Sequence, residues 1–185
     1  MTRADSSFRL PHSAFLLPMS TDQHRREAKA EIACAVITVS DTRTMDNDTG
    51  GKAVVDLLES AGHRVIERVI IPDEPEAMRV RLGEWADRDD VDAILLTGGT
   101  GISRRDQTFE TVSGLLTKTL PGYGELFRWL SYEEIGPASM LSRAVGGLIG
   151  STVVLTMPGS PGGVRLAMEQ IILKELGHLV REATK

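Results

Sequence analysis

The sequence predicts an α/β fold, a three-layer sandwich in which helices cover both faces of a mostly parallel sheet. Short continuous apolar runs have the length and composition of strands that are buried on both faces. Between these runs, apolar residues recur at helical spacing, and this alternation gives parallel strands joined by helices. The apolar runs are residues 32–39, 65–71, 93–97 and 153–157.

Apolar residues three or four positions apart mark the predicted helices. In the first helix, Val54, Leu58 and Ala61 share one face with Leu57, and Gly62 follows where a helix end is favoured. The other positions are Met78, Leu82 and Trp85 in a second helix, a start near Thr108 for a third, and Val164, Met168, Ile171, Ile172, Leu176 and Leu179 in the last.

Length and composition fit one domain preceded by a tail. The chain has 185 residues, of which 41% are hydrophobic and 25% are charged, an ordinary balance for a folded domain. Residues 1–30 have no sustained hydrophobic period, so we expect a flexible N-terminal tail there and the folded domain over residues 31–185. The single cysteine, Cys34, excludes an intramolecular disulfide and a cysteine-cluster zinc site, and its apolar neighbours predict an inert core residue.

Net charge and hydropathy exclude several classes of function. The net charge of −5 argues against a protein that coats nucleic acid and gives no support for binding to anionic membranes. No apolar run approaches the roughly 18 residues that a membrane span needs. The N-terminus also lacks the continuous apolar segment of a secretory signal. We therefore expect a cytoplasmic protein with no nucleic-acid or membrane partner.

Open parallel sheets bind ligands beyond the carboxyl ends of their strands, in the loops that lead into the helices. The first such loop carries Ser40, Asp41 and Asp48, which could offer hydroxyl and backbone groups to an anion, although Asp48 alone is better explained as a helix N-cap. In the second loop, Asp73 precedes Glu76 by three residues with a proline between them, which is a capping-box pattern. Asp73 could instead bind a cation at the edge of the sheet.

The third loop is the most informative. A buried strand ends in small residues, and basic and acidic residues then lead into the next helix: Thr97, Gly98, Gly99, Thr100 and Gly101, followed by Arg104, Arg105 and Asp106. Glycines let the backbone approach a phosphate closely, and the following helix N-terminus favours negative charge. The loop is neither a Walker A motif nor a dinucleotide fingerprint. Asp106 is well placed to hold Mg²⁺, and a glycine turn without a ligand is the less favoured interpretation.

The fourth loop contains Pro158, Gly159 and Ser160, between the last strand and the final helix. It again presents backbone N–H groups and a hydroxyl, but a ligand-free turn explains this loop equally well. Ser142 and Arg143 could contribute a phosphate contact, although an arginine at such a position is more often part of a solvated helix face.

The ordered set of motifs resembles the MoaB/Mog family of molybdenum cofactor biosynthesis proteins. The resemblance rests on TVSDTR at residues 38–43, TGGTG at 97–101 with Arg105-Asp106, and PGS at 158–160. PGYGE at 121–125, LSYEEIG at 130–136 and LSRAV at 141–145 are most similar to the MoaB branch. The match covers about residues 31–180, in order and with family-like spacing.

The resemblance implies a molybdopterin-binding fold, a homotrimer or a hexamer of trimers, and other molybdenum cofactor enzymes as partners. It implies an adenylyltransferase that uses Mg²⁺-ATP to convert molybdopterin to adenylyl-molybdopterin and pyrophosphate. Asp73 and Asp106 would be the catalytic acids and would hold Mg²⁺. The residues expected to bind molybdopterin or ATP are Ser40, Asp41, Asp48, Thr97, Gly98, Gly99, Thr100, Gly101, Arg105, Pro158, Gly159 and Ser160.

One alternative to the enzyme stays open. The protein could be a non-catalytic molybdopterin-binding or scaffolding member, although the retained Arg105-Asp106 pair favours an enzyme. Gln107 departs from the small apolar residue that is common next to this pair, which affects the expected loop geometry and not the acid.

A mixed apolar region could supply the oligomer interface or pack into the core; its residues are Phe127, Trp129, Leu130 and Tyr132.

Overall fold

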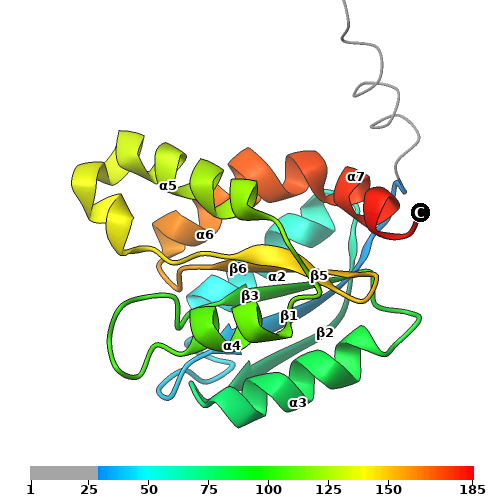
Figure 1. The fold of residues 1–185 in the computed structure, drawn as a ribbon, viewed down its shortest axis with the longest axis horizontal. Coiled ribbons are helices and arrows are strands. Elements are labelled where there is room, and N and C mark those ends of the chain that lie inside the picture. The colour runs from blue at the N-terminus through cyan, green and yellow to red at the C-terminus, as the bar shows by residue number, and fades with distance from the viewer. Residues whose placement is uncertain (1–28) are drawn as a thin grey trace, which may run out of the picture.

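A six-stranded sheet lies at the centre of residues 29–185, the part of the chain that this computed structural model describes (Figure 1). The strand order is β2-β1-β3-β6-β5-β4. The first four strands in this order are parallel, and β5 is antiparallel to both of its neighbours. The strands are β1 (Ala33–Val39), β2 (Arg64–Ile71), β3 (Ala93–Thr97), β4 (Lys118–Thr119), β5 (Gly146–Ile149) and β6 (Thr152–Met157). The four predicted runs are the four parallel strands, which confirms the mostly parallel sheet.

Helices cover both faces of this sheet, as predicted (Figure 1). One face carries α2 (Thr49–Ser60), α5 (Pro121–Ile135), α6 (Pro161–Ala167) and α7 (Leu173–Ala183); the other carries α3 (Pro75–Ala86) and α4 (Thr108–Leu115). A π-helical turn, Met168–Ile172, joins α6 to α7, so the last predicted helix is one continuous helical segment. A short 3₁₀ turn, Gly136–Leu141, follows α5.

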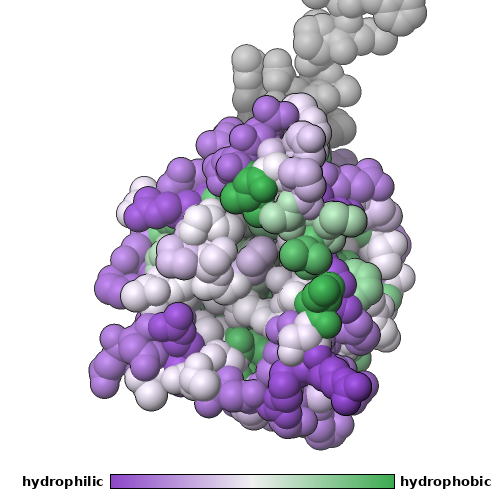
Figure 2. Space-filling model, turned by 90° about the vertical axis from the view of Figure 1, so that its left-hand side faces the viewer, coloured by the Kyte–Doolittle hydropathy of each residue, from purple (hydrophilic) through white to green (hydrophobic). Residues whose placement is uncertain are grey.

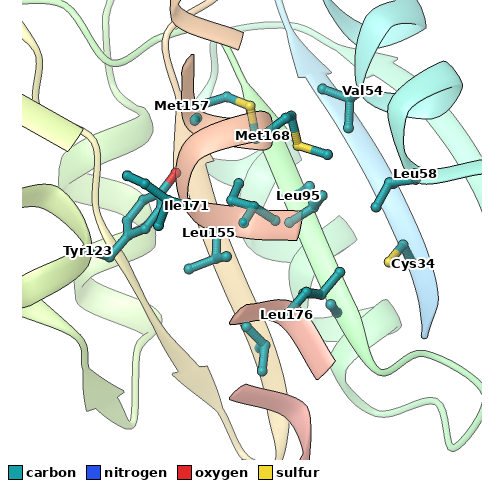
Figure 3. Packing of buried hydrophobic residues seen from close by; sticks show 14 of the residues in the cluster. Cys34, Val54, Leu58, Leu95, Tyr123, Leu155, Met157, Met168, Ile171 and Leu176 are labelled. Carbon is teal, nitrogen blue, oxygen red and sulfur yellow. The ribbon is translucent and has the colours of Figure 1, made fainter. Parts of the chain in front are cut away.

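The two hydrophobic layers explain why the strands read as unbroken apolar runs. Along β1, Cys34 and Val36 pack beneath α2, whereas Ala35 and Ile37 belong to the layer beneath α3 and α4. Successive side chains of a strand point to opposite faces, so a strand covered on both sides is apolar at nearly every position. Figure 3 shows the larger layer, in which Cys34 lies near Leu58 of α2. Burial raises the pKa of the Cys34 thiol to about 12, so this thiol is an inert core group, as predicted.

The apolar region on α5 divides between core and surface. Phe127 is buried and Leu130 packs against the core, so these two residues are not available for an interface. Trp129 and Tyr132 are 63% and 55% exposed. Other exposed large hydrophobic residues of α5 and the following 3₁₀ turn are Leu126, Ile135, Met140 and Leu141.

Two sequence predictions concern the whole chain. None of the helices found in residues 29–185 combines the length and apolar character that crossing a membrane requires. The predicted tail, residues 1–30, lies almost entirely outside the described residues.

Candidate functional site

The glycine loop, residues 98–107, leaves β3 at the carboxyl edge of the sheet and leads into α4. Gly98 and Gly99 have φ angles of +102° and +62°, a region that side chains other than glycine rarely adopt. A Cβ at Gly98 would lie 2.3 Å from the Val39 carbonyl oxygen, and a Cβ at Gly99 would lie 2.2 Å from Thr108 Oγ1. Both glycines are therefore required by backbone conformation and by close packing.

The glycine loop presents a row of free backbone donors. Gly98 N donates to the Met157 carbonyl at 3.0 Å, and Thr108 N donates to the Gly99 carbonyl at 3.1 Å, which fixes the two ends of the loop. Between these bonds, no acceptor among residues 29–185 receives the N–H groups of Gly99, Thr100, Gly101 and Ile102. Successive free N–H groups in a glycine-rich turn form a concave site for an anion.

The glycine loop and the fourth loop line one cleft of about 580 Å³. Pro158, Gly159 and Ser160 form part of its wall, and Phe127 and Ser131 of α5 contribute another part. In Figure 2, which views the left-hand side of Figure 1, residues of intermediate hydropathy gather near the centre, with hydrophobic residues beside them and hydrophilic residues below. This cleft joins two loops that are about 60 residues apart in the sequence, and Thr97 Oγ1 ties them by donating to the Pro158 carbonyl at 3.1 Å.

Ser142 is a cleft residue that the sequence did not single out beyond a general phosphate contact. It lines the cleft, and its buried hydroxyl has no hydrogen-bond partner within the described chain. A buried hydroxyl without a partner carries a free-energy cost that a bound ligand can remove. Ser142 is far from the glycine loop in sequence, and the fold brings it here through the hydrogen bonds that its neighbour Arg143 makes to the loop.

Asp106 and Asp73 both lie against the glycine loop, although the cleft lining includes Asp106 and not Asp73. Asp106 lines the cleft, and its Oδ2 accepts a hydrogen bond from Ser103 N at 2.7 Å. Asp73 is only 7% exposed, and its Oδ1 accepts from Gln107 N at 3.1 Å. Its other oxygen lies against Gly99, since a Cβ there would be 2.8 Å from Asp73 Oδ2. Burial raises the pKa of Asp73, and the negative charges of Asp106 and Asp41 raise it further.

The predicted capping box at Asp73 is wrong. The N-cap of α3 is Glu74, which makes no side-chain cap bond, and Pro75 occupies the first turn as expected. The carboxylate of Asp73 is instead turned toward Gln107, at the start of α4. The bond to a residue 34 positions away takes the place of the local cap.

Arg105 ties the first three loops together. Its guanidinium donates to Asp41 Oδ2 from Nη2 at 2.6 Å and from Nε at 3.1 Å, and Nη1 donates to Glu74 Oε1 at 2.9 Å. Asp41 Oδ1 also accepts from Asp73 N at 3.1 Å. The hydrogen bond from Arg105 is the main cause that lowers the pKa of Asp41. Asp41 and Arg105 therefore brace the carboxyl edge, and neither residue lines the cleft.

Asp48 caps α2, as the sequence predicts for this residue taken alone. Its Oδ1 accepts from Gly51 N at 2.9 Å, and its Oδ2 accepts from Thr38 Oγ1 at 2.6 Å and from Arg68 Nη2 at 2.7 Å. Burial alone would raise the pKa of Asp48, but the hydrogen bonds from Thr38, Arg68 and Gly51 lower it below its usual value. Ser40 lies nearby, in a smaller groove of about 180 Å³ that shares Gly98 and Gly159 with the cleft.

Arg143 contacts the glycine loop and is not part of a solvated helix face, which corrects the sequence interpretation. It follows the 3₁₀ turn, and its guanidinium donates to the carbonyl oxygens of Gly101 at 2.7 Å and Asp106 at 3.1 Å. Its side chain is 24% exposed and also pairs with Glu110. The three guanidinium nitrogens are therefore bonded to the glycine loop or to Glu110.

Comparison with known proteins shows the family and the fold of this chain. Residues 35–178 match the family described as "Probable molybdopterin binding domain". The chain belongs to this family of molybdenum cofactor biosynthesis proteins. It is 48% identical to molybdenum cofactor biosynthesis protein B of Bacillus cereus over 165 residues, which are 89% of this chain and 98% of the relative. The corresponding protein of Bacillus subtilis is 47% identical over 168 residues, 90% of this chain and 99% of the relative.

Solved structures show the same fold. A crystal structure of a molybdenum cofactor biosynthesis protein B superposes with a TM-score of 0.81 at 49% identity and covers 83% of this chain and 96% of that chain. The tungsten cofactor synthesizing protein MoaB from Pyrococcus furiosus superposes with a TM-score of 0.77 at 35% identity, over 85% of this chain and 100% of that chain. The sequence resemblance to the MoaB/Mog family is thereby confirmed.

Proposed function

We propose that this protein binds molybdopterin in the cleft and adenylylates it with Mg²⁺-ATP. The observation that carries the proposal is the row of free N–H groups from Gly99 to Ile102, together with Asp106 in the same cleft. Both substrates bring phosphate groups, and free backbone donors bind phosphate oxygens without a large cost of rearrangement. Ser142, with its buried and unpartnered hydroxyl, adds a further donor to the cleft.

The acids present suit Mg²⁺ held jointly with a substrate. No cluster of three or more metal-binding side chains exists among residues 29–185. Mg²⁺ commonly uses one or two carboxylates and completes its coordination with phosphate oxygens and water. Asp106 and Asp73 are the two carboxylates that we assign to it, and neither is hydrogen-bonded to a basic side chain within the described chain. When bound, Mg²⁺ would neutralise negative charge on the phosphates.

The reaction needs little covalent help from the protein. The terminal phosphate oxygen of molybdopterin attacks the α-phosphorus of ATP, a P–O bond forms, and the bond to pyrophosphate breaks. No general base is required, because the attacking phosphate oxygen is already ionised. The contribution of the chain is positioning and charge stabilisation, by the glycine-loop N–H groups and by Ser160 and Ser142 hydroxyls at the cleft wall.

We also propose that the protein acts as a homo-oligomer, with the exposed apolar residues of α5 and the 3₁₀ turn at the interface. Trp129, Tyr132, Ile135 and Met140 are each more than half exposed in the single chain. A cluster of large exposed hydrophobic residues is a common mark of a protein–protein interface. A trimer is the assembly that the family resemblance favours.

The experiment that tests the proposed activity follows adenylyl-molybdopterin and pyrophosphate with purified protein, molybdopterin and Mg²⁺-ATP. We expect both products in equal amounts, and Asp106→Asn should lose activity while Asp56→Asn should not. Asp56 is a suitable control because it is a half-exposed acid on α2 whose ion-pair partner is Lys52. Molybdopterin binding without either product would refute the adenylyltransferase proposal and favour a non-catalytic binding protein.

A further inference from the structure

Arg143 contacts the glycine loop through both its backbone and its side chain. Its N–H donates to the Thr100 carbonyl at 3.1 Å, Nε donates to the Gly101 carbonyl at 2.7 Å, and Nη2 donates to the Asp106 carbonyl at 3.1 Å. Its guanidinium also lies 5.3 Å from the centre of the Phe109 ring. One residue from a distant segment is therefore bonded to three carbonyl groups of the loop.

These bonds fix the direction of the N–H groups in the same peptides. A trans peptide is planar, and its C=O and N–H groups point in opposite directions. The Asp106 carbonyl faces Arg143, so the N–H of Gln107 in that peptide faces the other way, where it donates to Asp73 Oδ1 at 3.1 Å. One peptide group thus connects Arg143 on one side with the Asp73 carboxylate on the other.

The same reasoning applies to the free donors of the glycine loop. The carbonyls of Thr100 and Gly101 are bonded to Arg143, so the N–H groups of Gly101 and Ile102 point away from it. No acceptor in residues 29–185 receives these two N–H groups, and Gly101 lines the cleft. Without Arg143, these peptides could rotate, because glycine restricts backbone rotation less than any other residue.

We propose that Arg143 is a positioning residue that sets the peptide orientations of the glycine loop for phosphate binding and adenylyl transfer. Its effect on turnover rests on the proposed function; its effect on the loop does not. The side chain of Arg143 bonds carbonyl oxygens of the loop, so it acts through the peptides of Gly101 and Asp106. A planar guanidinium can donate to both carbonyls from two nitrogens at once, whereas a lysine ammonium is a single point charge on a flexible stem.

The ion pair with Glu110 offers a way to separate this role from a simple charge effect. Glu110→Gln removes the ion pair but leaves in place the two carbonyl bonds that the Arg143 side chain makes. Arg143→Lys keeps the positive charge but loses the paired geometry. If Arg143 positions the loop, Arg143→Lys should lose far more loop order and activity than Glu110→Gln.

The test compares Arg143→Lys, Glu110→Gln and the control Arg88→Lys in the full-length protein. Arg88 also makes ion pairs, with Asp90 and Glu67, but lies between α3 and β3, at the opposite edge of the sheet. Hydrogen–deuterium exchange is measured on the substrate-free protein, and melting curves check that each variant folds. For Arg143→Lys we expect the amide of Gln107 and the loop peptide around it to exchange about tenfold faster or more, with no such change in the other two variants.

Kinetic assays then measure the consequence for the reaction. Arg143→Lys should lower kcat by about tenfold or more with a smaller change in the KM for ATP, since misplaced groups affect the transition state most. Added guanidinium ion should partly restore the activity of Arg143→Ala. Unchanged exchange in Arg143→Lys, or an equal increase in Glu110→Gln, would overturn the proposal. If wild-type protein forms no adenylyl-molybdopterin, the proposed function fails, but the exchange result still decides whether Arg143 orders the loop.

Discussion

Asp73→Asn should leave the fold intact and reduce adenylyl-molybdopterin formation about a hundredfold. Asn keeps a carbonyl oxygen that can accept the hydrogen bond from Gln107 N, so the tie between the second loop and α4 survives. The amide cannot supply the anionic oxygen that Mg²⁺ prefers. The expected loss equals that of one preorganised electrostatic contact, about 2.7 kcal/mol in the activation free energy.

The direction in which the pKa of Asp73 is shifted predicts how Asp73→Asn changes the stability of the fold. Burial, together with the neighbouring charges of Asp106 and Asp41, raises this pKa in the folded state. The folded protein therefore binds this proton more tightly than the unfolded chain, so the stability that protonation provides is lost as pH rises through the folded pKa. At neutral pH the charged carboxylate destabilises the fold, and Asp73→Asn should melt at the same temperature as wild type or slightly higher.

The assay is product formation at saturating Mg²⁺-ATP, with a melting curve for each protein. Asp56→Asn, which removes the same charge from an exposed position on α2, should match wild type in both measurements. Near-wild-type turnover of Asp73→Asn would refute the assignment of Asp73 to Mg²⁺ and leave Asp106 as the only acid with a catalytic role. A large drop in melting temperature would contradict the argument from the raised pKa.

The remaining predictions concern the loop, the buried cap, the surface and the tail. Gly99→Ala should abolish molybdopterin binding in a titration and cost about 2 kcal/mol of stability because of its positive φ, whereas Gly114→Ala, with open space around it, should be neutral or stabilising. Asp48→Ala should cost about 3 kcal/mol, because it removes the helix cap at Gly51 N and the carboxylate that pairs with the partly buried Arg68. In wild type, this stabilisation is lost as pH falls through the lowered pKa of Asp48, which acid titration of the melting temperature measures. Trp129→Asp should shift the protein toward monomer in light scattering, and a wild type that shows only a 20.1 kDa species would refute the oligomer. Deletion of residues 1–28 should leave melting temperature and product formation unchanged.

The sequence predicts the parallel strands well and the antiparallel ones not at all. β1, β3 and β6 are buried on both faces, so each is a continuous apolar run that stands out in the sequence. β4 has two exposed residues, and β5 begins with two glycines. Those glycines are required by close packing, since a Cβ at Gly147 would lie 2.2 Å from the Lys118 carbonyl oxygen. Glycine there reflects a long-range contact, which a local pattern of hydrophobicity cannot reveal.

The structure confirms the cap predicted at Asp48 and contradicts the one predicted at Asp73, and long-range contacts explain both outcomes. At Asp48 the local bond to Gly51 N forms, and the buried pair with Arg68 adds to it without competing. At Asp73 the local cap is absent, because the carboxylate bonds to Gln107 across a sequence distance of 34 residues. The local signal is the stronger one at Asp73, where Pro75 and Glu76 follow, yet only the cap at Asp48 forms. What separates them is which distant backbone group the fold brings within reach.

The distribution of charge at the carboxyl edge supports the proposal that a divalent cation takes part in adenylyl transfer. Arg105 is held by Asp41 and Glu74, so the positive charge of this side chain is already paired. Asp73 and Asp106 accept hydrogen bonds only from backbone N–H groups within the described chain. Two such carboxylates beside the loop that we propose for phosphate binding would repel an anionic substrate, and a divalent cation would reverse that repulsion. Molybdopterin binding should therefore tighten with added Mg²⁺ in wild type, and this dependence should weaken when either carboxylate is replaced by an amide.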